Sequence, residues 1–241
     1  MPDPVSVVFI HGFMGSGSDW DAIRLQLPNH IATYVHEVAG DSMDEVSRRI
    51  LTTGPDRTVL AGYSMGARLA LHTAVMHPGK VRALILESGM PGLEAEEERV
   101  SRMARDEARA SELRRGGMVP FLHAWYEQTL FDSLRKQPVL RGQLIKERLD
   151  LNPERVAAEI CQLSVAGQPD HWAALPNLSM PVLALAGALD HKYAAVAERI
   201  AGLCAKGQCS VIDQAGHNVH LEQPEAYVAA VNKFLTELGD D

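Results

Sequence analysis

The sequence predicts an α/β protein in which a mostly parallel β-sheet is covered by helices on both faces and carries an inserted helical cap. Two observations lead to this prediction. Short apolar runs alternate with helical patterns near both ends of the chain, as expected for strands whose two faces are buried. Between about residues 94 and 172 the strand signal disappears, and several helical patterns follow one another.

Six apolar runs are the expected strands, and they lie at 6–10, 31–36, 58–61, 81–86, 182–186 and 209–212. A helix is expected over 65–77, directly after the third run. An amphipathic helix over 224–238, with a proline in its first turn, is expected to close the chain. This order predicts an α/β core formed by residues 1–92 and 176–241, with a helical cap at 93–175.

The cap segment is expected to begin with a helix over 94–115. Its first turns are acidic and its last turn is basic, which suits the helix dipole, and Glu98 and Arg102 are spaced for a surface ion pair. Glycines and prolines divide the rest of the segment into further helices. These breaks are Gly116-Gly117, Pro138, Asn152-Pro153 and Gln168-Pro169.

Composition narrows the classes of function. The chain has 241 residues, of which 46% are hydrophobic and 22% charged, so it can bury a sizeable core. Its net charge of -8 repels phosphate backbones and anionic membranes, and we expect neither as a partner. Three cysteines without repeated spacing make neither a disulfide framework nor a zinc site. The first apolar run is too short for a signal sequence or a membrane span, so we expect a cytoplasmic protein.

The clearest chemical motif is G-x-S-x-G at Gly62–Gly66. It follows the expected strand at 58–61 and precedes the expected helix, where the glycines permit a tight turn that exposes Ser64. The backbone N–H of Met65 then lies at a helix N-terminus, close to any negative charge that develops beside the serine. The alternative is a glycine-rich turn in which Ser64 only caps the helix.

A serine nucleophile or base needs a histidine and an acid, and both follow in the expected order. Asp190 comes directly after the strand at 182–186, and His217 lies in the loop after the strand at 209–212. Both positions are at the carboxyl edge of the sheet. In this arrangement Asp190 orients His217, and His217 exchanges a proton with Ser64. His191 and Asp213 are the alternative partners, because strand ends are the least certain part of the prediction.

Two other sites are less well supported. His217 and His220 form H-x-x-H, but no third ligand at a convincing spacing supports a metal site, and we expect no metal and no cofactor. The glycine-rich turn at 11–17 lacks the G-K-[ST] and G-x-G-x-x-G patterns of phosphate loops. It is better explained as part of an oxyanion hole in which the N–H of Phe13 joins that of Met65.

Together these motifs resemble the α/β-hydrolase superfamily, and they span nearly the whole chain. The motifs are H-G-F-M-G at Phe13, G-Y-S-M-G at Ser64, G-x-x-D at Asp190 and A-G-H-N-V-H-L-E-Q-P at His217. The segments 62–68, 87–93 with 97–99, 121–126 and 168–170 further resemble the 2-succinyl-6-hydroxy-2,4-cyclohexadiene-1-carboxylate synthases of menaquinone biosynthesis.

This resemblance implies a lyase that eliminates pyruvate from 2-succinyl-5-enolpyruvyl-6-hydroxy-3-cyclohexene-1-carboxylate, with the triad acting as a base on a ring proton. The substrate is a small polycarboxylate, so its pocket is expected to hold arginines. The resemblance assigns substrate binding to Arg68, Arg102, Arg148, Tyr63 and Trp125. Arg68 also lies one helical turn beyond Ser64. The alternatives are that Arg102 pairs with Glu98 or Asp106 and that Trp125 only fills the core of the cap.

Two other functions stay open at this point. A carboxylesterase or related acyl hydrolase uses the same triad with Ser64 as nucleophile, but its pocket is mostly apolar. A catalytically inactive scaffold that binds a small ligand has no need of an intact triad. The sequence does not indicate an oligomeric state.

Overall fold

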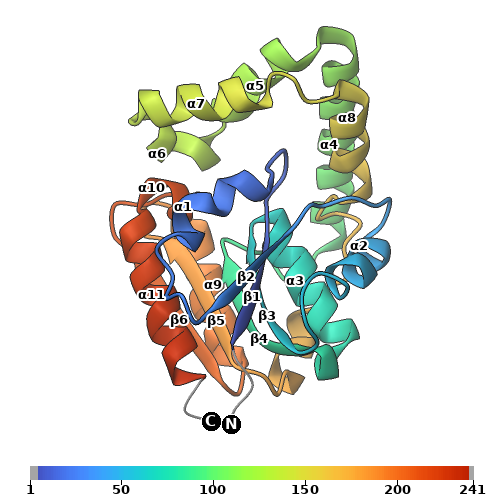
Figure 1. Ribbon diagram of the computed structural model, residues 1–241. Helices are drawn as coiled ribbons and strands as arrows, with labels where there is room; N and C mark the ends of the chain where they lie inside the picture. Colours follow the sequence, from blue (N-terminus) through green and yellow to red (C-terminus); the bar gives the residue numbers. More distant parts are fainter. Residues whose placement is uncertain (1–4, 239–241) are drawn as a thin grey trace.

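The computed structural model describes residues 5–238, and its centre is a six-stranded sheet between two layers of helices (Figure 1). The strand order is β2-β1-β3-β4-β5-β6, and every neighbouring pair is parallel. The predicted doubly covered parallel sheet is therefore confirmed, with strand ends within two residues of those expected. The strands are β1 (Ser6–Ile10), β2 (Ala32–His36), β3 (Thr58–Tyr63), β4 (Val81–Glu87), β5 (Val182–Gly187) and β6 (Gly207–Ile212).

Alternate residues of the central strands enter two separate cores. Val8 and Ile10 pack with the helices on one face, whereas Val7 and Phe9 pack with those on the other. The first face is covered by α2 (Met43–Ile50), α3 (Met65–Met76) and α9 (His191–Leu203), and the second by α1 (Asp21–Arg24) and α11 (Pro224–Glu237). Burial of both faces explains why these strands appear in the sequence as continuous apolar runs.

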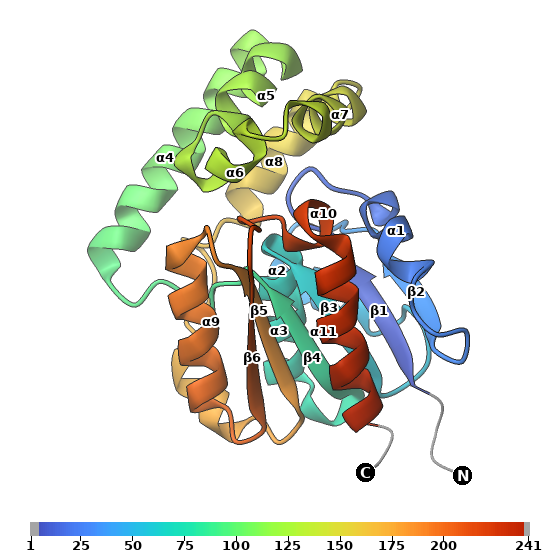
Figure 2. The same cartoon turned by 90° about the vertical axis from the view of Figure 1, so that its left-hand side faces the viewer.

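The segment between β4 and β5 is helical, as predicted, and it forms a third layer beyond the carboxyl ends of the strands (Figures 1 and 2). It has a hydrophobic core of its own, in which Leu113, Leu122 and Leu134 are fully buried. The domain limits expected from the sequence stay a prediction. The helices of this segment are α4 (Glu96–Gly116), α5 (Met118–Tyr126), α6 (Asp132–Arg135), α7 (Pro138–Arg148) and α8 (Pro153–Gln162).

The remaining elements are short. A one-turn helix, α10 (Val219–Glu222), precedes α11, and 3-10 turns lie at Gly17–Trp20, Pro78–Lys80, Thr129–Phe131 and Trp172–Asn177. Within residues 5–238, none of the helices combines the length and the apolar character needed to cross a bilayer.

A hydrogen-bonded chain of two buried histidines and an exposed aspartate joins α2, α3 and the 3-10 turn that precedes β5. His72 Nε2 donates to Asp44 (2.8 Å), so its Nδ1 is free to accept from Nε2 of His171 (3.0 Å). His171 is 5% exposed, and burial lowers its pKa from 6.5 to about 4. His171 is therefore neutral in the folded protein at neutral pH.

This histidine predicts a loss of stability in mild acid. Between pH 6.5 and about pH 4, the unfolded chain binds a proton at His171 but the native state does not. The free energy of unfolding therefore falls as the pH decreases across this window. We expect His171→Gln to remove up to roughly 3 kcal/mol of that fall. Urea denaturation between pH 7 and pH 4 measures the free energy of unfolding of both proteins. Substitution of the exposed His30 by Gln is the control and should leave the pH dependence of the wild type unchanged.

Candidate active site

Ser64 lies in a strained turn between β3 and α3. Its backbone adopts φ 51° and ψ −106°, and its side chain makes no capping hydrogen bond to α3. The alternative in which this serine only caps the helix is therefore wrong. A left-handed φ at a non-glycine residue costs free energy, and it persists here because the surrounding backbone fixes the turn. Ser64 N–H, for example, donates to the carbonyl of Glu87 (2.8 Å).

Two glycines permit this turn. A Cβ atom on Gly66 would lie 2.1 Å from the carbonyl oxygen of Ile10, and one on Gly62 would lie 2.3 Å from the backbone of Gly66. The start of α3 therefore packs against the end of β1 at a distance that excludes any side chain.

A hydrogen-bonded chain runs from Ser64 through His217 to Asp190. His217 Nδ1 lies 2.8 Å from Oδ2 of Asp190, and its Nε2 lies 3.1 Å from Oγ of Ser64. Because a carboxylate only accepts, Nδ1 carries the hydrogen and Nε2 is left to accept from the serine hydroxyl. The structure pairs His217 with Asp190, whereas the alternative partners His191 and Asp213 are exposed.

Side chains of Glu222 and Ser88 hold the His217 loop in place through hydrogen bonds. Glu222 accepts from the N–H groups of Gly216 (3.0 Å) and Asn218 (3.1 Å), and Ser88 Oγ donates to the His217 carbonyl (2.9 Å). Glu222 lies five residues after His217, so its hydrogen bonds join the two ends of the loop. Glu222 lies within the A-G-H-N-V-H-L-E-Q-P motif, but the motif does not show that its side chain holds the loop.

His220 is hydrogen-bonded to a buried carboxylate. Its Nδ1 lies 2.9 Å from both carboxylate oxygens of Glu87, which is fully buried at the end of β4. Its ring stacks on Trp20 with centroids 4.3 Å apart. Within the part of the chain that the structure describes, there is no group of three or more His, Cys, Asp or Glu residues able to hold a metal ion.

The glycine-rich turn after β1 lies beside Ser64. Phe13 and Met65, the two residues expected in the oxyanion hole, both line the cavity that contains the serine. His11 anchors this turn, because its Nδ1 donates to the Gly12 carbonyl (2.8 Å) and its Nε2 accepts from the Val38 N–H (3.0 Å). His11 thus has a structural place in the loop.

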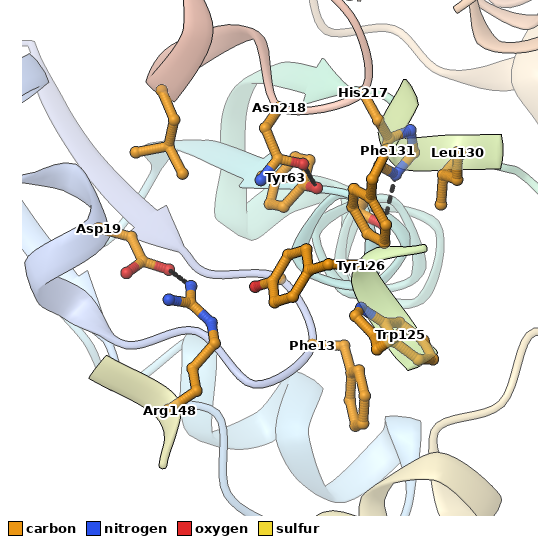
Figure 3. Close-up of a pocket in the computed structure, with 13 residues that line it drawn as sticks. Phe13, Asp19, Tyr63, Trp125, Tyr126, Leu130, Phe131, Arg148, His217 and Asn218 are labelled. Carbon is orange, nitrogen blue, oxygen red and sulfur yellow. Dashed lines mark hydrogen bonds and ion pairs between the residues drawn. The ribbon is translucent and has the colours of Figure 1, made fainter. Parts of the chain in front are cut away.

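Ser64 lies between two cavities that share Phe13, Trp125 and Leu130 in their walls. The smaller has a volume of about 40 Å³ and is shown in Figure 3, and the larger has a volume of about 110 Å³. The smaller cavity is lined by Gly12, Phe13, Asp19, Tyr63, Ser64, Trp125, Tyr126, Leu130, Phe131, Arg148, His217, Asn218 and Leu221. Arg148, Tyr63 and Trp125, which the resemblance assigns to substrate binding, therefore line the same cavity as the serine, and their role stays a prediction.

The larger cavity contains the two other expected arginines. Arg68 donates to Gln168 (3.0 Å) and to the Leu163 carbonyl (2.7 Å), and Arg102 pairs with Asp106 (2.8 Å). Burial, and then the neighbouring Arg102, lower the pKa of Arg68 to about 10, so it keeps its charge at neutral pH. Of the two acids weighed for Arg102, the structure selects Asp106 and not Glu98.

Arg148 connects the helical layer to the loop after β1. Its guanidinium pairs with Asp19 (3.0 Å), and both side chains are largely buried (Figure 3). Nε of Arg148 is buried and lacks a hydrogen-bond partner within residues 5–238. The position of Asp19 in the sequence does not mark it as a partner of a residue 129 positions away.

Aromatic rings form the other walls. Trp125 packs against Phe13 with ring centroids 4.9 Å apart, so it is both part of the core of the helical layer and a wall of the cavities. The Tyr63 hydroxyl donates to Asn218, and burial raises the pKa of Tyr63 well above its usual value. The sequence analysis did not identify Tyr193, whose ring packs edge-on against His217 with ring centroids 4.6 Å apart. Its position three residues after Asp190 is the feature of the sequence that could have indicated it.

The fold and this geometry agree with comparisons to known proteins. A family model described as "Alpha/beta hydrolase family" matches residues 7–230. The chain belongs to the alpha/beta hydrolase family. This membership confirms the predicted fold class and the expectation of an enzyme, because the curated relatives of the chain are enzymes of this family.

The relatives also confirm the narrower resemblance. The chain is 33% identical to the 2-succinyl-6-hydroxy-2,4-cyclohexadiene-1-carboxylate synthase of Serratia proteamaculans, with 97% of this chain and 94% of that one covered. The structure of MenH from S. aureus is similar with a TM-score of 0.90 at 26% identity, covering 99% and 96% of the two chains. An esterase from Thermogutta terrifontis, with a TM-score of 0.79 at 24% identity over 98% and 90%, shares the fold alone.

The packing of the serine turn predicts a strong effect of one methyl group. We expect Gly66→Ala to lower the free energy of unfolding by about 3 kcal/mol or more, because the added Cβ meets backbone that has no room to move. Chemical denaturation followed by circular dichroism measures the change. Gly202→Ala in α9 is the matched control, because its Cβ meets nothing within 4 Å and should raise stability slightly. Equal effects of the two substitutions would contradict the role of the close approach.

Proposed function

We propose that this protein is a lyase of menaquinone biosynthesis. In the proposed reaction it eliminates pyruvate from 2-succinyl-5-enolpyruvyl-6-hydroxy-3-cyclohexene-1-carboxylate and forms 2-succinyl-6-hydroxy-2,4-cyclohexadiene-1-carboxylate. The names of the relatives support this activity. The observation that carries it is the set of arginines in the cavities on either side of Ser64, because three carboxylates need several cations close to the reacting serine.

In this proposal Ser64, His217 and Asp190 form the catalytic base. His217 Nε2 takes the hydroxyl proton as Ser64 Oγ removes a proton from the substrate ring. The electrons of the broken C–H bond first form an enolate on the succinyl carbonyl. As this enolate collapses, its electrons form a ring double bond, the existing ring double bond shifts by one position, and the C–O bond to the enolpyruvyl group breaks. The leaving enolpyruvate takes up the proton held by His217 and becomes pyruvate, which restores the triad. No acyl-enzyme is formed. Asp190 stabilises the imidazolium formed during the step.

The backbone N–H groups of Phe13 and Met65 are proposed to stabilise the enolate that forms when the ring proton leaves. Met65 is the first residue of α3, so the positive end of the helix dipole adds to its hydrogen bond. The arrangement needs no cofactor in this proposal, because the substrate supplies both the acidic proton and the leaving group.

The arginines are proposed to bind the substrate carboxylates, with Arg68 and Arg102 in the larger cavity and Arg148 in the smaller. Arg102 and Arg148 already pair with Asp106 and Asp19, so each must share its donors between the aspartate and the substrate. A guanidinium has five N–H donors, which makes such sharing possible. Tyr63 and Trp125 complete the walls around the ring.

A small polycarboxylate is thus the proposed partner, and the cytoplasm is the proposed location. The expectation that neither nucleic acid nor a membrane is a partner also stays a prediction.

A second candidate function is a carboxylesterase. The aromatic wall formed by Phe13, Trp125 and Phe131 favours it, because such a wall also suits the apolar part of an ester. In that reaction Ser64 is the nucleophile, and the same N–H groups stabilise a tetrahedral intermediate.

Product analysis separates the two reactions. We expect the purified protein to release pyruvate from the proposed substrate, measured by coupling to lactate dehydrogenase, and to cleave p-nitrophenyl esters slowly. Ser64→Ala should lower kcat for pyruvate release by about three orders of magnitude or more, because it removes the base. Brisk ester cleavage without pyruvate would favour the esterase, and an unchanged rate in the variant would favour an inactive scaffold.

The charge of the pocket gives an independent test. We expect Arg68→Ala to lower kcat/KM for pyruvate release by about a hundredfold, because a charge-assisted hydrogen bond to a buried carboxylate is lost. Arg49→Ala is the control, since Arg49 is an exposed residue of α2 paired with Glu45. Steady-state kinetics of both variants measure the effect, and an unaltered kcat/KM for Arg68→Ala would remove this arginine from the site.

A further inference from the structure

The larger cavity opens to solvent between α4 and the start of α9. An outer basin with a volume of about 300 Å³ shares Leu93, Arg102 and Lys192 with the cavity that contains Ser64, so the two spaces adjoin. Glu94, just before α4, pairs with Arg199 of α9 and so ties the start of the helical layer to α9. A substrate that enters by this route passes Lys192 before it reaches the serine.

Lys192 lies on this route with its donors unused. Its Nζ has no hydrogen-bond or ion-pair partner among residues 5–238, and it lies 5.7 Å from the centroid of the Tyr193 ring. By contrast, Arg68 donates to Gln168 and Leu163, and Arg102 is paired with Asp106. Arg105, which also lines the outer basin, donates through Nε to the Ser101 carbonyl (3.4 Å). An incoming carboxylate therefore meets a cation that needs to give up no internal partner.

Lys192 determines whether the lining of the larger cavity has a net positive charge. Arg68 and Arg102 are matched in number by Asp106 and Glu159, so without the lysine two cations face two carboxyl groups. Lys192 supplies the excess positive charge that a polyanion requires. In the outer basin Lys192 also gives the cations their excess, because Arg102, Arg105 and Lys192 there face Glu97 and Glu98.

The position of Lys192 is tied to the catalytic geometry. Asp190 Oδ1 caps the first turn of α9 by accepting from the Tyr193 N–H (3.2 Å), while its Oδ2 accepts from His217. The backbone of Lys192 is thus held by the carboxylate that orients the histidine. Its flexible side chain extends from this fixed point over the mouth of the cavity.

We propose that Lys192 forms, with Arg102, a carboxylate-binding subsite at the mouth of the larger cavity and selects polyanionic substrates. This inference rests on the proposed function. The exposed ammonium captures one carboxylate while the others enter toward the arginines. Such a rim charge acts on substrate capture and on its salt dependence more than on the chemical step.

The test compares Lys192→Gln with the wild-type enzyme and with Lys206→Gln. Lys206 is exposed and lies beyond the opposite end of α9, so its substitution makes the same change in net charge away from the cavity. We expect Lys192→Gln to raise KM for pyruvate release about tenfold, the low end for a charged hydrogen bond, and to leave kcat within about twofold. Lys192→Arg should restore most of the affinity, and Lys206→Gln should behave like the wild type.

Ionic strength provides the second readout. We expect kcat/KM of the wild type to fall as salt increases from about 0.01 M to 0.3 M and that of Lys192→Gln to fall less, because the screened attraction is smaller. A wild-type KM and a wild-type salt dependence in Lys192→Gln, in an enzyme that releases pyruvate, would overturn the subsite and leave the proposed function intact.

A binding measurement keeps the two proposals separate. If the wild-type protein releases no pyruvate, the lyase proposal fails, and titration calorimetry with citrate as a tricarboxylate probe then decides the subsite. Weaker citrate binding by Lys192→Gln than by the wild type and Lys206→Gln supports it. Equal affinities, or no binding by the wild type at millimolar citrate, overturn it.

Discussion

The site depends on one constraint, which is that parallel strands bring their carboxyl ends to a single edge of the sheet. β3, β5 and β6 end at Tyr63, Gly187 and Ile212, and the three loops that follow carry Ser64, Asp190 and His217. The distances of 3.1 Å and 2.8 Å in the hydrogen-bonded chain are possible because these loops start from the same edge of the sheet, with only β4 between β3 and β5. The close packing of α3 on β1 through Gly66 then fixes the direction of the serine.

Buried carboxylates make the histidine loop rigid. Glu222 holds the backbone on both sides of His217, and the Glu87–His220 pair anchors the next turn to the end of β4. A buried carboxylate is costly unless its hydrogen bonds are satisfied, and here each carboxylate accepts from more than one donor. The loop is therefore built into the core of the protein, which suits a histidine that must keep its geometry while a proton moves.

The chain is acidic as a whole, yet cations gather where the helical layer faces the sheet. Each of the arginines near Ser64 has an internal acceptor, which holds the guanidinium in place before a ligand arrives. Preorganised donors of this kind lose less entropy on binding than free side chains. Lys192 is the complementary case, because its donors are free and its side chain is flexible. The arrangement combines fixed cations inside the site with an adaptable one at its mouth.

Much of this was accessible from the sequence. The apolar runs, the strand–glycine–serine turn and the loops that carry Asp190 and His217 follow from local rules of burial and turn geometry, so the sheet and the relation of the three residues could be predicted. What only the tertiary structure decided are contacts between distant segments, such as Asp19 with Arg148, Arg68 with Gln168 and Leu163, and Glu87 with His220. Such pairs have no sequence spacing of their own. They arise because the helical layer packs over the sheet, and packing brings together charges that the order of residues along the chain does not relate.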